Sequence, residues 1–339
     1  MTSVVSKRRV VVFALGGTIA MTADPRGGVV PTLSGQDLLA GVPGLVELGV
    51  EVEVEEFRRI PAGSLSFADL HGLSAAIDSR LAAGADGVVV IQGTNTIEET
   101  AYLVDLTHRH DAPVVFTGAM RNPTLAGPDG PANLLAAVAT AAHPACRGLG
   151  CLVVFADEIH AAAQVRKSHT MSVAAFTSPN TGPLGHLVEG VPRILTRPAH
   201  RYTVPGRPVP GRSPRVALMT VTLGDEGESL PATADLDGLV VAAFGVGHVP
   251  ERLLPELTAQ AARIPVVYTS RTNAGSTATG TYGFPGSERD LIARGLIPAG
   301  FVDPVKARLL LYTLLRHGID RSGVAEAFAA AGTTAAAGA

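Results

Sequence analysis

Three short segments carry side chains of the kinds used in nucleophilic catalysis. Thr18 lies in Leu15–Ala20 directly after two glycines, and Thr94 follows a single glycine in Gln92–Thr96. Lys167 stands between Arg166 and Ser168 later in the chain. A hydroxyl is a weak nucleophile until a positioned base takes its proton, and a lysine near two threonines is able to supply that base. Each segment alone also fits a structural turn or a solvated lysine, so the prediction of catalysis depends on their combination.

Both threonines follow short β-branched runs that are typical of buried strands. Strands alternating with helices give right-handed crossovers and a doubly wound, mostly parallel sheet, so we expect an α/β fold. Ligands bind such sheets beyond the carboxyl ends of the strands, which is where Thr18 and Thr94 stand. The expected strands are Val10–Leu15, Val50–Phe57, Gly87–Ile91, Val114–Thr117 and Leu152–Phe155, and the expected helices are Ser34–Leu39, Phe67–Ala83, Thr96–His110 and Asp129–Ala142.

Further polar residues near these turns have simpler interpretations. Glu98 and Glu99 fall in the first turn of an expected helix, where acidic side chains complement the helix dipole, so we assign them that role rather than catalysis. A third turn, Thr117–Arg121, follows a strand and contains small residues such as Ala119 that keep a crevice open. Arg121 itself is expected to be a solvated or interdomain arginine.

A change of composition divides the chain into two domains. Residues 192–215 are dense in Pro, Gly and Arg without an apolar period, which is typical of an interdomain connector. Residues 1–191 form the expected larger domain, and residues 216–330 form a smaller α/β domain with a closing helix around Val305–Arg316. Residues 331–339 are low in complexity and are expected to fray.

The composition excludes several classes of function. The chain has 27 basic and 30 acidic residues, so no basic excess indicates nucleic-acid or membrane binding. Its 2 cysteines, Cys146 and Cys151, match no metal pattern and are expected to be core thiols in a reducing compartment. The G-x-G-x-x-G fingerprint, the P-loop and a clustered metal motif are all missing, so we expect no cofactor and no metal. The first 20 residues lack a cleavage site, which predicts a cytoplasmic protein acting on a small molecule.

Taken together, the segments resemble the bacterial-type L-asparaginase/glutaminase family, in order, over nearly the whole chain. The resemblance implies a larger N-terminal and a smaller C-terminal α/β domain, and a homo-oligomer, dimer or tetramer, with sites between subunits. It implies that Thr18 is the nucleophile, that Thr94 and Lys167 form its partner pair, and that Ser64 binds the substrate carboxylate, with Ala119 also at the substrate. Thr18 would be acylated with release of ammonia and the acyl group then hydrolysed. The matching segments read LGGTIA, IPAGSLSFADL, QGTNTIEET, TGAMR, RKSHT and FTSPNTGPLG.

The chain departs from the family pattern at four places. Asn95 replaces an aspartate that belongs to the threonine–lysine group and also holds the substrate ammonium, and Leu65 replaces a glutamine that grips the same ammonium. Tyr282 aligns with the acidic residue that a neighbouring subunit contributes. The tyrosine expected in the loop after the nucleophile is missing from Met21–Gly35. Asn95 also predicts a lower pKa for Lys167, because an amide does not favour the charged amine.

The first three departures remove acceptors for a substrate ammonium. A desolvated ammonium without an acceptor costs several kcal/mol, which favours a substrate whose α-amino group is acylated, missing or replaced. Two alternatives stay open within the family: an ordinary asparaginase that grips the amine elsewhere, for example with His248, and a member silenced by Asn95, natural or introduced. Outside it, a noncatalytic binding protein would keep the fold without releasing ammonia.

Overall fold

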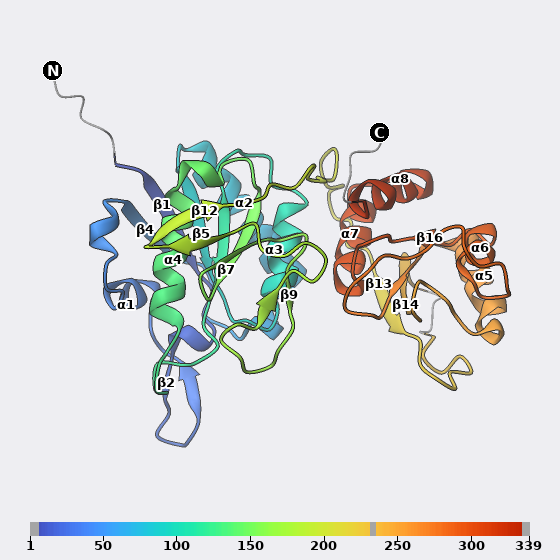
Figure 1. Ribbon diagram of the computed structural model, residues 1–339, viewed down its shortest axis with the longest axis horizontal. Coiled ribbons are helices and arrows are strands. Elements are labelled where there is room, and N and C mark those ends of the chain that lie inside the picture. Colours follow the sequence, from blue (N-terminus) through green and yellow to red (C-terminus); the bar gives the residue numbers. More distant parts are fainter. Residues whose placement is uncertain (1–6, 231–234, 334–339) are drawn as a thin grey trace. The chain divides into compact units, whose positions relative to one another are not determined.

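The computed structural model describes residues 7–230 and 235–333 of the chain. These residues form two compact units, and the division between the units falls after Arg197 (Figure 1). Each unit has its own sheet and its own helices. The structure thus has the expected α/β class, with a larger and a smaller parallel-sheet unit.

The first unit is built on a sheet of eight strands in the order β12-β11-β8-β7-β6-β5-β1-β4. The five strands from β4 to β7 are parallel, and the other three add antiparallel pairs. The prediction of a mostly parallel sheet is therefore confirmed. The strands are β1 (Arg9–Ala14), β4 (Glu51–Glu56), β5 (Gly87–Ile91), β6 (Val114–Thr117), β7 (Cys151–Phe155), β8 (Glu158–Ala161), β11 (Gly185–Val188) and β12 (Val191–Ile194).

Two hydrophobic clusters place the helices of this unit on opposite faces of the sheet. One cluster joins Leu39 and Leu134 to Val10 and Val89, and the other joins helix residues such as Leu73 to the alternate strand positions. Burial on both faces explains the continuous apolar runs of β1 and β5. The helices are α1 (Gly35–Ala40), α2 (Phe67–Ala82), α3 (Ile97–Asp105) and α4 (Gly130–Ala142), with short 3-10 turns at Thr18–Ala20, Val46–Leu48, Ala62–Ser64 and Pro144–Cys146.

Several local predictions can be compared with these elements. The stripe Leu70, Leu73, Ile77 and Leu81 on α2 is buried as expected, and Ser66 caps this helix with its hydroxyl. Cys146 and Cys151 are both buried, and burial raises the pKa of Cys146 to about 11. The expected helix Thr96–His110 is shorter in the structure and ends at Asp105. Asp105 is the last residue of α3, and its carboxylate accepts the N–H of Cys151 at 2.9 Å, which ties the helix end to β7.

The expected connector at 192–215 begins inside the sheet. Residues 192–194 belong to β12, which pairs antiparallel with β11 across a tight turn at Glu189 and Gly190. The pairing with β11 draws these residues into the first unit, and the boundary between the units falls after Arg197. Two small antiparallel pairs complete this unit: β2 (Met21–Ala23) with β3 (Val29–Pro31), and β9 (Arg166–Lys167) with β10 (Phe176–Thr177).

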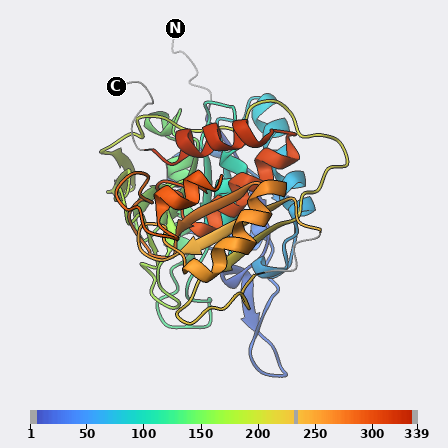
Figure 2. The same ribbon diagram turned by 90° about the vertical axis from the view of Figure 1, so that its right-hand side faces the viewer.

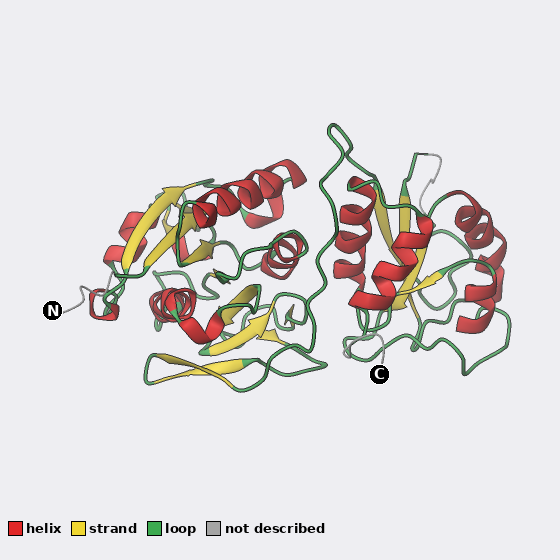
Figure 3. Cartoon of the chain, turned by 90° about the horizontal axis from the view of Figure 1, so that it is seen from above, coloured by secondary structure: helices red, strands yellow, loops and turns green. Residues whose placement is uncertain are grey.

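The second unit has a parallel four-stranded sheet in the order β13-β14-β15-β16. In Figure 3 its strands lie between two pairs of helices, and Figure 2 shows these helices in orange and red. Its strands are β13 (Val216–Thr220), β14 (Gly238–Ala243), β15 (Val266–Ser270) and β16 (Ile297–Pro298), and its helices are α5 (Leu254–Arg263), α6 (Glu288–Ala293), α7 (Pro304–Arg316) and α8 (Arg321–Ala331), with a 3-10 turn at Glu251–Leu253.

The C-terminal predictions fall partly outside the structure. The expected closing helix corresponds to α7, and α8 follows it as a helix that the sequence pattern did not predict. The expected tail starts at residue 331, the last residue of α8, and its residues 334–339 lie outside the described residues. Within residues 7–230 and 235–333, no helix has the length and hydrophobicity that crossing a bilayer requires.

Candidate active site

The turns after β1 and β5 pack directly against each other at the carboxyl edge of the larger sheet. The two strands are parallel neighbours, and their turns present Thr18 and Thr94. Gly17 has a φ of +102°, and a Cβ on this residue would collide with the backbone N and Cα of Gly93. Glycine is needed at position 17 for two reasons, because its backbone has a positive φ and because a Cβ would not fit against Gly93. The Gly-Gly-Thr and Gly-Thr segments therefore bring the two threonine turns into contact.

The segment with Ser64 joins the same edge through backbone contacts. Ile60 donates its N–H to the carbonyl of Leu15 at 3.3 Å, and the hydroxyl of Thr96 donates to the carbonyl of Ala62 at 3.2 Å. Ser64 is exposed at the end of its 3-10 turn. Leu65 is partly buried and packs against the core cluster beneath α2 and α3. This position thus offers an aliphatic chain and no polar atom.

Thr94 and Lys167 meet although 73 residues separate them in the sequence. Lys167 Nζ donates to Thr94 Oγ1 at 2.8 Å, and the threonine is 6% exposed. The lysine is held on β9 by its pairing with Phe176, and Ser168 donates its N–H to the carbonyl of Ala175 at 2.7 Å. A hydroxyl in contact with an amine in a mostly buried turn is a chemically competent pair for proton transfer.

The pKa of Lys167 lies below its ordinary value, and Asn95, from which the sequence predicts a lowering, is not among the causes. Burial of the amine is the largest influence, because desolvation disfavours the charged form. The charge of Glu98 opposes burial and raises the pKa. A carboxylate therefore faces this lysine even though Asn95 is neutral, and Asn95 itself is exposed in the turn.

Glu98 is the residue whose role the sequence reasoning missed. Its Oε2 accepts the backbone N–H of Lys167 at 3.0 Å, a contact beyond the predicted dipole role. Glu98 and Glu99 both lie in the first turn of α3, as expected. Thr94 precedes α3, which begins at Ile97, so helical spacing does not relate the two residues and the sequence carried no local signal of this contact.

The third turn, with Ala119, is rigidly held by the start of α4. Asp129 accepts the backbone N–H of Met120 at 3.0 Å and that of Arg121 at 2.8 Å. A Cβ on Gly118 would collide with the carbonyl oxygen of Gln92, so this turn packs against the one with Thr94. Ala119 is 1% exposed. Arg121 is exposed, with Nη1 donating to the carbonyl of Gly127 at 3.3 Å, as expected for a solvated arginine.

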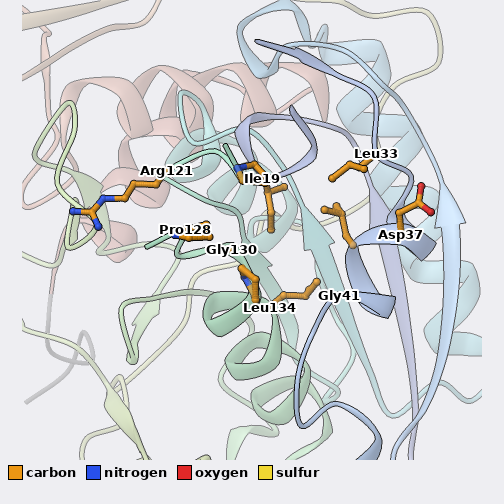
Figure 4. Close-up of a pocket in the computed structure, with 11 residues that line it drawn as sticks. Ile19, Leu33, Asp37, Gly41, Arg121, Pro128, Gly130 and Leu134 are labelled. Atoms are coloured by element: carbon orange, nitrogen blue, oxygen red, sulfur yellow. The ribbon is translucent and has the colours of Figure 1, made fainter. Parts of the chain in front are cut away.

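An apolar pocket of about 180 Å³ adjoins the turn that carries Thr18. Ile19, the residue after Thr18, forms one wall, and Figure 4 shows it among Leu33, Gly130 and Leu134. The guanidinium of Arg121 extends away from this group in Figure 4. A Cβ on Gly130 would lie 2.7 Å from Cγ1 of Ile19, so the absence of a side chain there leaves the space that Ile19 occupies. The apolar lining suits packing of the threonine turn rather than recognition of a polar amide.

His248 and Tyr282 belong to one cluster within the second unit. The rings lie edge to face with centroids 4.9 Å apart, and Tyr282 is 44% exposed. His248 Nε2 lies 3.1 Å from Oε2 of Glu288, which is buried. Burial raises the pKa of Glu288, but the backbone N–H of Tyr282, at 2.5 Å, and other donors outweigh it and leave the pKa below its ordinary value. The acidic group in this segment is thus Glu288, six residues after Tyr282, which the sequence reasoning did not single out.

Replacing Gly17 by alanine tests the contact between the two threonine turns. We expect kcat for amide hydrolysis to fall by on the order of 10²-fold, because the new Cβ must push the Thr94 turn away. The matched control is Gly49→Ala, since Gly49 also has a positive φ, +64°, but open space around its Cβ position. Equal activity of the two variants would show that the contact between the two turns does not matter for catalysis.

The chain was compared with protein-family models, with known sequences and with solved structures, and all three comparisons find matches over most of its length. Residues 9–200 match the family model described as "Asparaginase, N-terminal", and residues 215–328 match "Glutaminase/Asparaginase C-terminal domain". A probable L-asparaginase of Deinococcus radiodurans is 37% identical over 327 residues, covering 94% of this chain and 97% of that protein. L-asparaginase 2 of Escherichia coli is 36% identical over 252 residues, covering 72% and 70%. A crystal structure of a probable cytoplasmic L-asparaginase from Campylobacter jejuni superimposes with a TM-score of 0.84 at 30% identity, covering 95% and 99%.

Proposed function

Because the chain belongs to the asparaginase family, we propose that it hydrolyses a side-chain amide to a carboxylate and ammonia, with Thr18 as the nucleophile. The observation that carries this proposal is the 2.8 Å hydrogen bond between Lys167 Nζ and Thr94 Oγ1. That pair stands in a turn packed against Gly17, next to Thr18. Relatives named L-asparaginase over nearly the full length of the chain agree with this activity.

The proposed reaction has two stages. The Thr18 hydroxyl attacks the amide carbon, its proton leaves toward the Thr94–Lys167 pair, and the C–N bond breaks as the nitrogen is protonated and departs as ammonia. Water then attacks the acyl ester on Thr18 and gives a proton to the pair, the pair returns a proton to the Thr18 oxygen as the ester bond breaks, and the carboxylate is released. Lys167 must accept a proton in both stages, and its lowered pKa makes more of the neutral amine available for this. Backbone N–H groups at the turns would hold the oxyanion, each worth roughly 3–4 kcal/mol.

The proposal also concerns which amide the protein hydrolyses. The proposed substrate-binding residues are Ser64, Leu65, Asn95 and Ala119. Leu65 packs into the core and Asn95 carries no charge, so these positions offer a substrate ammonium no carboxylate. This favours an amide whose α-amino group is acylated, missing or replaced. The alternative is L-asparagine itself, with its amine held by other residues or by water.

Ammonia release from a small panel of amides tests the function. The panel contains L-asparagine, L-glutamine, N-acetyl-L-asparagine and succinamate, the last two lacking a free α-ammonium. Release from any of them supports the amidohydrolase proposal, and the ranking of kcat/KM decides between the two substrate classes. Release from none would contradict the proposal and favour a silent relative that keeps the fold.

Restoring a carboxylate in the second turn tests the substrate argument. In the Asn95→Asp variant we expect kcat/KM for L-asparagine to rise by about 10- to 100-fold, since a hydrogen bond to a charged group contributes roughly 1.5–3 kcal/mol. kcat/KM for N-acetyl-L-asparagine is expected to gain nothing. The control is Asn122→Asp, which adds a carboxylate to another exposed turn of the same unit. A kcat/KM for L-asparagine that stays at the wild-type value would count against the missing carboxylate as the determinant.

We also propose a homo-oligomer, dimer or tetramer, in the cytoplasm. The resemblance to a family whose sites lie between subunits supports the first point. The second is supported by the Campylobacter jejuni protein, whose description reads probable cytoplasmic L-asparaginase, although a relative from Haemophilus influenzae is described as periplasmic.

A further inference from the structure

Glu98 faces Lys167 from the first turn of α3. Its Oε2 accepts the Lys167 backbone N–H at 3.0 Å, while the side chain of the same lysine reaches Thr94 Oγ1 at 2.8 Å. The two contacts join α3, the β9 strand and the turn after β5, which are separated by 69 and 73 residues along the chain. One carboxylate thus holds the backbone of the residue whose amine meets the threonine hydroxyl.

The charge of Glu98 acts on the same lysine. Glu98 is the charged group that acts on the amine from α3, against the burial that disfavours its cationic form. From the turn after β5 the group facing the amine is the neutral hydroxyl of Thr94, and from β10 the residue paired with Lys167 is the apolar Phe176. Asn95, one residue after Thr94, is exposed and uncharged.

A short antiparallel pair needs such an anchor. Strands β9 and β10 have two residues each, and a ladder of this length is marginal by itself. A charge-assisted hydrogen bond contributes more than a neutral one, so the Glu98 carboxylate stabilises the position of Lys167. Displacement of the amine by about 1 Å is enough to reduce the rate of proton transfer strongly.

We propose that Glu98 is the positioning residue of this site: its carboxylate holds Lys167 against Thr94 and supplies the negative charge that Asn95 does not provide. The inference rests on the proposed function, because its consequence is a correctly placed base for Thr18. Glu98 acts through Lys167 and need not touch the substrate.

Three variants separate position from charge. Glu98→Gln keeps an acceptor oxygen for the Lys167 N–H but removes the charge, and Glu98→Ala removes both. Glu99→Gln is the matched control, since Glu99 lies in the same first turn of α3 and its loss weakens the same helix-dipole interaction. The thermal unfolding midpoint of each variant identifies any that fails to fold.

In the enzymatic arm, kcat and KM are measured against pH on the best amide substrate. We expect Glu98→Ala to lower kcat by on the order of 10²-fold with little change in KM, because the amine loses its position but the substrate keeps its contacts. We expect Glu98→Gln to keep kcat at its plateau within a few-fold. Its acid limb should move to lower pH, since loss of the negative charge lowers the pKa of Lys167 and the neutral amine persists further into acid. Glu99→Gln should match the wild type in both respects.

A second experiment measures the titration of the Lys167 amine directly and needs no enzymatic activity. The chain has three lysines, Lys7, Lys167 and Lys306, so labelling with ε-¹³C lysine gives few signals, and Lys167→Met assigns the one of interest. We expect its titration midpoint to fall in Glu98→Gln and to stay unchanged in Glu99→Gln. Equal shifts in both variants, no shift in either, or a wild-type kcat in Glu98→Ala would overturn the proposal. If no amide is hydrolysed at all, the proposed function fails while this titration still decides whether Glu98 acts on Lys167.

Discussion

Thr18→Ala is expected to reduce ammonia release from the best amide substrate by about 10⁴-fold or more, since loss of a nucleophile removes covalent catalysis altogether. Thr18 stands where β1 ends, in a 3-10 turn that Gly17 seats against the Thr94 turn. The alanine variant should fold normally, because the turn is held by backbone contacts such as the N–H of Ala20 donating to Gly17 at 3.0 Å. Initial rates of ammonia release, with the unfolding midpoint alongside, measure this.

Two further threonine variants make the result specific. Thr18→Ser keeps a hydroxyl and should retain measurable activity. Thr107→Ala is the control, because Thr107 is a partly buried threonine of the same unit whose hydroxyl donates to the carbonyl of Val104 at 3.2 Å. Its rate should equal that of the wild type. A Thr18→Ala variant that keeps more than a tenth of the wild-type rate would contradict the role of Thr18 as nucleophile.

Loss of the Thr94–Lys167 pair is expected to lower kcat by about 10²- to 10⁴-fold, the range typical of general acid–base catalysis. Thr94→Val and Lys167→Met each break the 2.8 Å hydrogen bond, so each should cost nearly as much as the double variant. Strong non-additivity is expected because the hydroxyl and the amine act as one unit. A double-mutant cycle on kcat measures it.

Lys167→Arg distinguishes a base from a fixed positive charge. Arginine keeps the charge but is not deprotonated in proteins, so the variant should be as inactive as Lys167→Met. The control is Lys7→Arg, which changes an exposed lysine near the start of the described residues. An active Lys167→Arg enzyme, or single variants whose effects simply add, would show that the pair does not relay protons.

The parallel strands and the helices of the first unit could be predicted from the periodic patterns of apolar residues in the sequence. The apolar runs at Gly87–Ile91 and Val114–Thr117 coincide with β5 and β6, because a parallel strand buried on both faces must be apolar throughout. The stripe on α2 could be predicted for the same reason, since its apolar positions recur at helical spacing. Placing Thr18 and Thr94 at one sheet edge required only that their strands be parallel.

The antiparallel strands β8, β11 and β12 could not be predicted because their turns lack the usual residues. A two-residue hairpin turn of type I′ needs positive φ at both positions, a conformation that Asn-Gly or Asp-Gly normally signals. Here the pairs are Ala156-Asp157, with φ of 48° and 63°, and Glu189-Gly190, with φ of 51° and 73°. Neither pair is one of these dipeptides, so no sequence signal marked the turns, and residues 192–194 were assigned to a connector.

The partners of the site residues depended on contacts distant in sequence. The role of Glu98 arises from its contact with Lys167, 69 residues away, and a carboxylate at a helix start has a sufficient local explanation. The pairing of His248 with Glu288 also could not be predicted from local sequence, because 40 residues separate the two. Glu98 lies inside the matching segment QGTNTIEET, but the resemblance carried over no role for this residue, so only the contact with Lys167 reveals it.

The most direct test of a threonine acyl-enzyme is mass spectrometry of the protein quenched in acid during turnover of the best amide substrate. The account predicts a covalent adduct with the mass of the substrate acyl group, located by peptide mapping on Thr18 and absent from Thr18→Ala. An adduct on Thr94 instead, or steady ammonia release by the wild type with no adduct on Thr18, would contradict it.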